Sequence, residues 1–444
     1  MSMETDLTRG SIPRQLIRYA LPLIGSSVLQ AAYGIVDMIV AGQFIGSAGL
    51  SGITNATTVI TLLTQIIFGL CTGGCILVGQ YYGAKDRENC RSAATTLYTM
   101  GLAIGIIFAV VLFLLSGSII RLLKAPALQE AGIYMRTCCV GLIFVAGYNA
   151  TSAALRAIGN SRAPLVCIIA TSAVNIVLDI LFVLPLNMGV FGAALATIIA
   201  QAISFLVALF FVVRSRDVLG IHPLHFRLDR VKLFKEAQLG LPCVAQETMV
   251  AISWLSITYL LNSHGIAASA ASGVATKIKD LAQLFIVSAM NAAATMVAQN
   301  LGAGEYERAK QTTMTALKLT IAAACVLILI TECFAPQLVA CFTREADTAA
   351  LAVLNLRIEI IGQIFYAVFL TYHALMIGAG TTWYVFLSAF INCIPVRITL
   401  AFLLNHFFGI SGLFTALMLA PASSIPFCLW YYRSDRWKTN AIKQ

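Results

Sequence analysis

Two carboxylates stand inside long apolar stretches in the first half of the chain. Asp37 lies 19 residues beyond Arg18, and Asp179 lies 16 residues beyond Ala163. If these stretches are membrane-spanning helices, both carboxylates lie roughly 24–28 Å from the same side of the bilayer, near one level in its outer half. An ionised group inside a membrane costs ~2.5 kcal/mol or more, so a functional role is the default interpretation.

Polar residues accompany these carboxylates at helical spacing. The pairs that are four residues apart are Tyr33 with Asp37, Asn175 with Asp179, and Ala193 with Thr197. Residues four apart share a helix face, so three helices can each present a two-residue patch at comparable depth. Oxygen-rich ligands without thiolates suit a hard cation such as Na+, or a proton carried on a carboxylate. We therefore predict a site for Na+ or H+; the candidate Na+ ligands are Asp37, Asn175, Asp179 and Thr197.

A structural ion pair is the simplest alternative for the two carboxylates. The deep parts of the first six apolar stretches contain no Lys or Arg, since Arg136 and Arg156 lie near the ends of theirs. The acids must then be protonated or paired with a cation that arrives from outside. A hydrogen-bonded contact between helices remains the competing interpretation.

The second half places an acid and a base near the middle of the membrane. Glu247 lies 9 residues past Gln238, and Lys277 lies 11 residues past Ile266 from the opposite side. Both depths are roughly 14–17 Å, which predicts an internal Glu247–Lys277 ion pair, with a proton or substrate site at Glu247 as the alternative. No role is predicted for the other charged or amide residues of these stretches, which are Lys279, Asp280, Asn291, Glu332, Glu359 and Arg397.

The helices that must position these groups follow from composition. Of 444 residues, 59% are hydrophobic and 11% are charged, whereas an average soluble domain has about 25% charged residues. A spanning helix needs roughly 20 apolar residues. Twelve stretches qualify, near 15–43, 50–81, 92–116, 129–157, 163–185, 190–213, 237–262, 266–300, 308–334, 349–377, 383–404 and 410–432. We predict an all-α integral membrane protein with twelve transmembrane helices in a lipid bilayer.

The net charge of +10 follows the predicted topology. With twelve spans both termini lie on one side, and that side holds 20 of the 29 Lys and Arg, the other side 5, and the helices 4. Such a bias predicts that both termini are cytoplasmic in a multi-pass protein of the cell membrane. The positive charge is thus a topology signal, and we expect no nucleic-acid partner.

An internal repeat divides the chain at an offset close to 220 residues. Four landmarks recur in the same order: Pro22 as Pro242, Gln80–Ala84 as Gln299–Ala303, Tyr134–Arg136 as Asn355–Arg357, and Gly159 as Gly380. We predict a six-helix lobe at 1–213, a basic cytoplasmic linker at 214–236, a second six-helix lobe at 237–432 and a cytoplasmic tail at 433–444. Parallel repeats of this kind occur in transporters.

Other chemistries have little support in the sequence. The 12 cysteines are mostly scattered singly through apolar segments, and the five histidines form no metal-binding pair. No Gly-rich loop followed by Lys-Ser or Lys-Thr is present, so direct use of ATP is not indicated. We expect neither an enzyme nor a cofactor beyond the coupling ion, and we expect a monomer.

These motifs resemble the multidrug and toxic compound extrusion (MATE) family, most closely its bacterial DinF-like and MepA-like branch. The resemblance covers nearly the whole chain. It rests on Pro22 and Asp37, on GQYYGAKD at Gly79–Asp86, on Asn175 with Asp179, and on AQNLGAG at Ala298–Gly304.

The resemblance implies an antiporter in which two six-helix lobes surround a central cleft. Such proteins let Na+ or H+ run inward and export cationic, amphipathic organic compounds. It further implies a cation site in the first lobe, which would comprise Tyr33, Asp37, Asn175, Asp179, Ala193 (through its carbonyl) and Thr197. Asn149 corresponds to one more family residue, although its depth along its helix is lower.

Two other functions stay open at this point. A lipid-linked precursor flippase of a related fold is one, although such proteins tend to carry cleft arginines that the first half lacks. An ion channel is the other, because channels are also built from duplicated halves.

Overall fold

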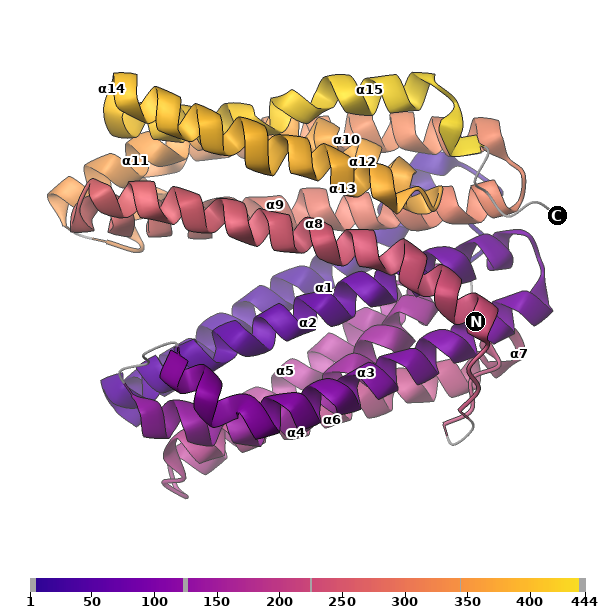
Figure 1. The fold of residues 1–444 in the computed structure, drawn as a ribbon, viewed down its shortest axis with the longest axis horizontal. Coiled ribbons are helices and arrows are strands. Elements are labelled where there is room, and N and C mark those ends of the chain that lie inside the picture. The colour runs from indigo at the N-terminus through magenta and orange to yellow at the C-terminus, as the bar shows by residue number, and fades with distance from the viewer. Residues whose placement is uncertain (1–4, 123–126, 224–225, 344, 439–444) are drawn as a thin grey trace. The chain divides into compact units, whose positions relative to one another are not determined.

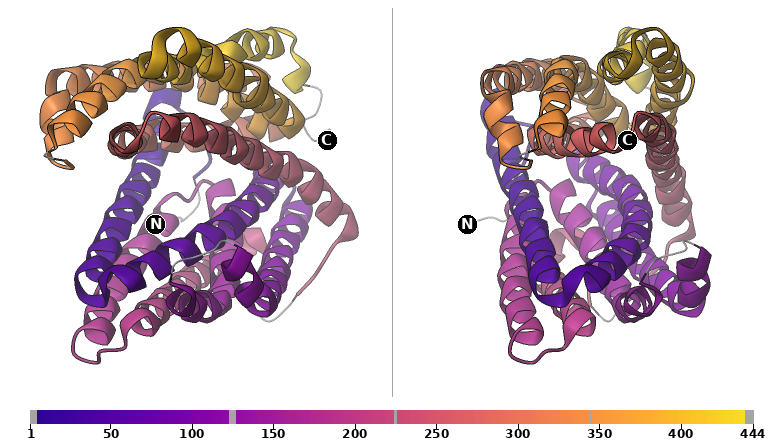
Figure 2. Two further views of the ribbon diagram at one scale, coloured as in Figure 1. Left: turned by 60° about the vertical axis from the view of Figure 1, so that its left-hand side comes forward. Right: turned by 90° about the vertical axis from the view of Figure 1, so that its left-hand side faces the viewer.

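The computed structural model describes residues 5–122, 127–223, 226–343 and 345–438, without the side chains of residues 47 and 48. Within these ranges the regular elements are helices, and Figures 1 and 2 draw coils and no arrows. They are α1 (Ile12–Val40), α2 (Gly46–Gly83), α3 (Arg87–Leu122), α4 (Leu128–Ala157), α5 (Arg162–Val183), α6 (Gly189–Arg214), α7 (Arg216–Leu219), α8 (Arg230–Ser263), α9 (Ile266–Gly302), α10 (Tyr306–Ala340), α11 (Ala346–Ile361), α12 (Gln363–Gly378), α13 (Thr382–Ile391), α14 (Arg397–Leu419) and α15 (Ile425–Arg433), with short π or 3-10 turns η1 (Ala41–Ile45), η2 (Asn392–Val396), η3 (Ala420–Ser424) and η4 (Arg436–Lys438). The predicted all-α class is confirmed. Residues 439–444 of the predicted tail lie outside the described ranges.

The number of membrane spans depends on how two bent helices are counted. Ten described helical runs are long and apolar enough to cross a membrane, and an eleventh forms if α11 and α12, which meet at a 43° bend, are one span. The run Thr382–Arg433 has 52 residues, about 78 Å of helix against a hydrocarbon core of about 30 Å. Its helical path breaks at Gly409, which has φ 59° and ψ −143°. The run therefore contains both predicted spans, 383–404 and 410–432.

Helix α4 is the centre of the first compact unit, which comprises Leu21–Val244 and the residues up to Asp6. It packs against α2, α3 and α6, and 67% of its most apolar stretch is buried. Small residues allow this close packing: a Cβ atom on Gly101 of α3 would lie 2.7 Å from the Cβ atom of Ala150. Between helices in lipid, such close van der Waals contact contributes much of the attraction.

Helix α9 has the same role in the second unit, which comprises Leu7–Ala20 and the chain from Ala245 onward. It packs against α10, α11 and α12. Gly378 of α12 permits the contact, because a Cβ atom there would lie 2.6 Å from a methyl carbon of Val297. The centre of each unit is thus a helix approached closely through glycine.

The turns of the two units recur as the internal repeat predicts. Gly159 and Gly380, which follow α4 and α12, have φ values of 82° and 71° and close the same pattern of backbone hydrogen bonds. Lys85 and Gly304, which follow α2 and α9, have φ values of 60° and 75°. Glycine adopts such left-handed conformations without steric cost, which explains its presence at three of these four turns; Lys85 adopts the same conformation at the fourth.

Each compact unit also includes a short segment that belongs to the other half of the sequence. Residues 7–20 join the second unit, and the beginning of α8 up to Val244 joins the first. The predicted lobes at 1–213 and 237–432 and the predicted linker at 214–236 did not include this exchange.

Polar contacts attach the beginning of α8 to the first unit. Lys232 is buried, and its Nζ donates hydrogen bonds to the Tyr81 hydroxyl and the Asn89 amide oxygen, each at 2.7 Å. Asp229 caps α8, and its carboxylate accepts a hydrogen bond from the Ser92 hydroxyl at 2.9 Å. Hydrogen bonds, first from the Lys232 backbone N–H and then from Ser92, hold the pKa of the Asp229 carboxyl below its usual range. The end of the predicted linker is therefore part of a packed unit.

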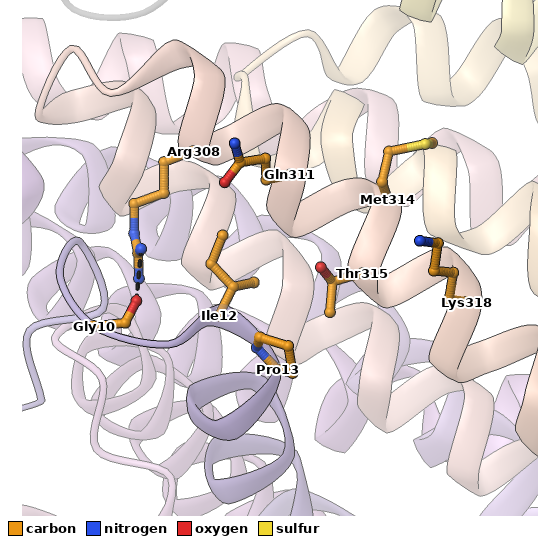
Figure 3. A pocket seen from close by; sticks show the side chains of 8 residues that line it. All are labelled: Gly10, Ile12, Pro13, Arg308, Gln311, Met314, Thr315 and Lys318. Atoms are coloured by element: carbon orange, nitrogen blue, oxygen red, sulfur yellow. Dashed lines mark hydrogen bonds between the residues drawn. The ribbon is translucent and has the colours of Figure 1, made fainter.

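An arginine makes the corresponding attachment in the second unit. Arg308 of α10 donates hydrogen bonds to the carbonyl oxygens of Gly10 (2.8 Å) and Leu7 (3.3 Å) and to the Gln15 amide oxygen (2.8 Å). Figure 3 shows the hydrogen bond from Arg308 to Gly10 and the residues of α10 beside it. These residues, with Ile12 and Pro13, line a cavity of about 440 Å³. In the second unit a guanidinium that donates to carbonyl oxygens holds the exchanged segment, whereas in the first unit a capping carboxylate does so.

Candidate functional site

The structure brings Asp37 and Asp179 together inside the first unit. Asp37 lies three residues before the end of α1, and Asp179 lies four residues before the end of α5. Their carboxyl groups are close enough to interact directly. Asp179 is 1% exposed, and Asp37 is partly buried. The equal depth predicted from residue numbers therefore corresponds to spatial contact.

The two residues that precede these acids by one helical turn lie at the same place. The Tyr33 hydroxyl is near both carboxyl groups, and the Asn175 side chain is beside the Asp179 carboxyl. Neither Asn175 nor Asp179 makes a hydrogen bond of good geometry to a described protein group through any side-chain oxygen or nitrogen. Buried polar atoms normally have partners, so this group has the capacity to hold a cation or a proton.

Helices α4 and α6 complete the surroundings of the carboxylates. The Thr197 hydroxyl donates to the Ala193 carbonyl oxygen at 3.0 Å, so the carbonyl predicted as a ligand already has a local donor. Tyr134 of α4 is buried near Asp37, and its hydroxyl is within reach of Thr197 and of Thr57 on α2. From the sequence, Tyr134 was noted only as a landmark of the repeat. Its phenol links the acid pair to α6. The sequence signal that could have identified Tyr134 as a site residue was a polar aromatic side chain within an apolar span.

Asn149 is apart from this group. Its amide nitrogen donates to the Val145 carbonyl oxygen of its own helix at 2.8 Å. It lies 11 residues beyond Cys138, the α4 residue whose thiol interacts with Asp37, which is about 16 Å along the helix. No described contact joins Asn149 to the acids.

Apolar side chains enclose the end of the bundle at which the acids meet. The buried cluster there includes Val40 beside Asp37 on α1, Val183 beside Asp179 on α5, and Ala193 on α6. Within the described ranges, neither acid belongs to an ion pair with Lys or Arg. Two carboxylates in an apolar environment cannot both remain charged without a counter-cation, because burial and mutual repulsion both oppose it.

The donor set fits a hard monovalent cation or a proton better than a transition metal. It contains carboxylate, amide, phenol and hydroxyl oxygens from Asp37, Asp179, Asn175, Tyr33 and Thr197. No group of three or more His, Cys, Asp or Glu side chains in the described residues has the arrangement of a metal site. Oxygen donors of this kind favour hard ions.

A further buried acid of the first unit, Glu236, was not predicted. It is 0% exposed, and neither carboxylate oxygen has a hydrogen-bond partner among the described groups. Its backbone oxygen lies where a Cβ atom on Gly73 of α2 would come within 2.3 Å. The sequence assigned residue 236 to the end of a polar linker, so its burial followed only from the packing of α8.

The Glu247–Lys277 ion pair predicted for the second unit is wrong. Lys277 is exposed, and the buried lysine of α9 is Lys279, which forms an ion pair with Glu359 of α11. Two residues on a helix differ by about 200° in direction, so Lys277 and Lys279 face opposite sides. Residue counting along the helix fixed no face, and neither Lys277 nor Glu247 is a member of the observed ion pair.

Glu247, the second-lobe candidate, lines a polar cavity together with the new ion pair. The cavity is about 460 Å³ and also receives Asp280 and Arg397. Four residues for which the sequence predicted no role, Lys279, Asp280, Glu359 and Arg397, thus share this cavity with Glu247. In the sequence these residues lie in three separate apolar stretches, 266–300, 349–377 and 383–404.

The chain matches known proteins along nearly its whole length. The family model described as MatE matches residues 22–181 and 242–403, one segment in each half of the repeat. "Probable multidrug resistance protein YoeA" of Bacillus subtilis is 27% identical over 98% of this chain and 96% of its own. "Multidrug export protein MepA" of Staphylococcus saprophyticus is 21% identical over 93% of this chain and 91% of its own.

Solved structures show the same fold. An outward-facing multidrug resistance MATE family transporter of the MOP superfamily superposes with a TM-score of 0.91 at 20% identity, covering 98% of each chain. A MOP superfamily transporter from Pyrococcus furiosus, described as having a binding pocket of reverse polarity, gives a TM-score of 0.91 at 19% identity over 99% of this chain and 98% of that one.

Proposed function

The chain belongs to the MatE family, and from this premise we propose that it is a secondary active antiporter. It exports cationic, amphipathic organic compounds across the cell membrane in exchange for Na+ or H+. The observation that carries the proposal is the contact between Asp37 and Asp179, two acids in an apolar bundle without a resident basic partner among the described residues.

The acid pair supplies the coupling chemistry. A Na+ ion would be coordinated by oxygen atoms of Asp37, Asp179, Asn175 and Thr197. A proton would bind to one carboxylate and be shared with the other. Either ion neutralises charge for which the described residues provide no basic partner. Because the unpartnered polar atoms of Asn175 and Asp179 are side by side, a single ion can satisfy several of them at once.

Helix α1 connects ion binding to a change of conformation. It carries Asp37 near one end and Pro22 in its interior, and the boundary between the compact units falls at Leu21. A proline removes one backbone donor and weakens the helix locally. We propose that ion binding at Asp37 bends α1 at Pro22, which lowers affinity for the exported compound and favours its release outside.

The membrane potential supplies enough free energy for useful export. One elementary charge that moves down the potential releases ~2.3 kcal/mol per 100 mV. One ion per cycle then sustains a concentration ratio of roughly 50-fold per 100 mV for a compound that moves no net charge. For a monovalent cation exchanged one for one, the charges cancel and the concentration gradient of Na+ or H+ supplies the driving force. We further propose multi-pass insertion with both termini cytoplasmic, from the excess of Lys and Arg on that side. We propose that a monomer is sufficient, because each unit contains its own packed core.

The test is gradient-driven transport of ethidium in everted membrane vesicles that contain the protein. We expect ethidium uptake under either an imposed Na+ gradient or an imposed H+ gradient, and loss of that uptake when monensin or nigericin dissipates the gradient. Uptake that ignores both gradients would contradict antiport and favour a channel. Movement of a fluorescent lipid-linked sugar in place of ethidium would favour a flippase.

A further inference from the structure

The cavity beside Arg308 has charged residues of one sign only. Arg308 and Lys318 line its volume of about 440 Å³, and all of its lining residues belong to the second unit. None of these lining residues, which the structure describes in full, is Asp or Glu. A hollow lined by cations and neutral groups attracts negative charge. The cavity therefore favours an anionic ligand.

The polar lining residues follow one face of α10. Four of them have side chains that donate hydrogen bonds, and they succeed one another at intervals of three, four and three residues: Arg308, Gln311, Thr315 and Lys318. Residues at these intervals share a helix face. Figure 3 shows the four in this order along α10. Because side chains on a helix tilt toward its beginning, Lys318 leans back along the row toward Thr315.

The charge of Lys318 is not neutralised by its own helix. Lys318 is exposed and forms none of the described ion pairs. Between Glu307 and Glu332, α10 has no acidic residue. A charged side chain in a spanning helix is costly unless it reaches an anion or the interface. The ammonium group of Lys318 is therefore available to an anion that the described residues do not provide.

The length of α10 places Lys318 just below the lipid headgroups. The helix has 35 residues, which is about 52 Å against a hydrocarbon core of about 30 Å. An equal overhang at both ends is about 11 Å. The backbone of Lys318 lies about 18 Å from the start of the helix, and so about 7 Å inside the core. A lysine near a helix end extends its ammonium group to the headgroups.

The face of α10 that carries Lys318 continues as an apolar surface. Leu329 lies eleven residues beyond Lys318, which returns it to the same side of the helix. It is 65% exposed, as is typical of a side chain that contacts lipid chains. Ile12 and Pro13 make the opposite wall of the cavity apolar. The ligand that suits this place is an amphiphile, with its anionic group beside Lys318 and its acyl chains along α10.

We propose that the cavity binds the headgroup of an anionic phospholipid, in the leaflet on the side where α10 begins. The phosphate lies between Lys318 and Arg308, as in other basic pockets between spanning helices. It accepts charge-assisted hydrogen bonds from Lys318 and further ones from Thr315 and Gln311. Arg308 already holds residues 7–15 through hydrogen bonds, so the lipid adds a second attachment between this segment and α10.

Native mass spectrometry of the purified protein, released from detergent micelles, tests the preference for headgroup charge. Dioleoyl phosphatidylglycerol and dioleoyl phosphatidylcholine share their acyl chains, and only the first has a net negative charge. We expect the first phosphatidylglycerol molecule to bind about fivefold more tightly, because one lysine near an anionic lipid contributes about that factor. Equal binding of the two lipids would overturn the proposal.

Lys318→Met is the decisive variant, because it removes the charge and keeps a long, unbranched side chain. It should bind phosphatidylglycerol no better than phosphatidylcholine, whereas Lys318→Arg should keep the preference. Phosphatidylcholine binding at the wild-type level shows that the variant is folded. Lys310→Met is the matched control, since Lys310 is an exposed lysine of the same helix outside the cavity lining. A preference that survives Lys318→Met, or that falls equally in Lys310→Met, contradicts a site at this cavity.

Hydrogen exchange distinguishes a lipid from a free phosphate ion. Phosphatidylglycerol should slow exchange at residues 7–12 of the wild-type protein and not of Lys318→Met, because the headgroup joins this segment to α10. Inorganic phosphate at the same concentration should have no effect. Equal slowing by inorganic phosphate would show that the site takes a free anion, and the lipid assignment would be wrong.

The lipid site goes beyond antiport and is tested separately from it. Both measurements are made without an ion gradient, so failed ethidium transport would disprove antiport and leave the lipid site in place. Asp179→Asn should keep the preference for phosphatidylglycerol, because Asp179 belongs to the first unit.

Discussion

The two halves of this protein share their turns and differ in how they treat buried charge. The first unit holds Asp37 against Asp179 with no described basic partner, whereas the second sets Lys279 against its buried Glu359. Left-handed residues end equivalent helices in both, at Gly159 and Gly380. The two halves therefore share turn geometry and differ in buried charge: the second holds an internal counter-charge, and under the proposed function the first takes up an ion.

We expect the largest difference between the two units when Glu359 is substituted, as a loss of stability. Glu359→Gln leaves Lys279 buried without its carboxylate, and removing one partner of a buried pair costs about 3–5 kcal/mol. Thermal unfolding of the purified protein in detergent should show a large fall in Tm.

The double variant Lys279→Met with Glu359→Leu is the control for this prediction. Replacing both partners by apolar groups of similar size is close to neutral, so most of the lost stability should return. Equal destabilisation by the single and double variants would show that the ion pair is not what stabilises this region.

In the first unit we expect substitution of a buried acid to change ion binding and to leave folding stability nearly unchanged. The expected change in free energy is smaller than that for Glu359. Asp179→Asn removes a charge that no described basic residue neutralises, so Tm should change little. Ion binding loses a charge-assisted interaction worth ~1.5–3 kcal/mol, or about 10- to 100-fold in affinity. Dependence of ethidium transport on Na+ or H+ concentration measures this shift.

Glu88→Gln provides the matched control, because Glu88 is an exposed carboxylate at the start of α3. It should leave both transport and Tm unchanged. An Asp179→Asn protein that transports ethidium with unaltered ion dependence would remove the acid pair from the coupling mechanism.

The smallest expected difference concerns the two exchanged segments. Hydrogen bonds lower the pKa of the Asp229 carboxyl in the folded protein, so its contribution is present above the unfolded pKa of about 3.9 and is lost as pH falls through the lower folded value. Hydrogen exchange, corrected for intrinsic rates, should therefore show weakened protection at the start of α8 only in strong acid. Residues 10–15, held by Arg308, should not follow, because arginine stays protonated.

Asp229→Ala sharpens this test. It removes the cap, so protection at the start of α8 should be lower at neutral pH and independent of acid. A wild-type protein in which both segments lose protection at the same pH would indicate general acid unfolding in place of a local effect.

Much of the site was predictable because depth in a membrane is a one-dimensional quantity. Helix rise converts residue numbers into distance, and on that basis Asp37, Asp179, Tyr33 and Asn175 were expected at one level, where the structure has them together. The same measure set Asn149 lower, and no described contact joins Asn149 to the acids. The contribution of Tyr134 was missed because it depends on which face of α4 meets α6.

The sequence by itself determined the all-helical membrane class, the repeat and the expectation that Asp37 and Asp179 lie at one level, since these follow from run lengths of apolar residues against a fixed bilayer thickness. Only the tertiary structure decided which residues face each other. Each residue advances a helix by about 100°, so Lys277 and Lys279 point in different directions: Lys277 is exposed, and Lys279 is the partner of Glu359. The burial of Glu236 and the exchange of segments at residues 7–20 and before Val244 were decided in the same way, by packing between helices that are distant in the chain.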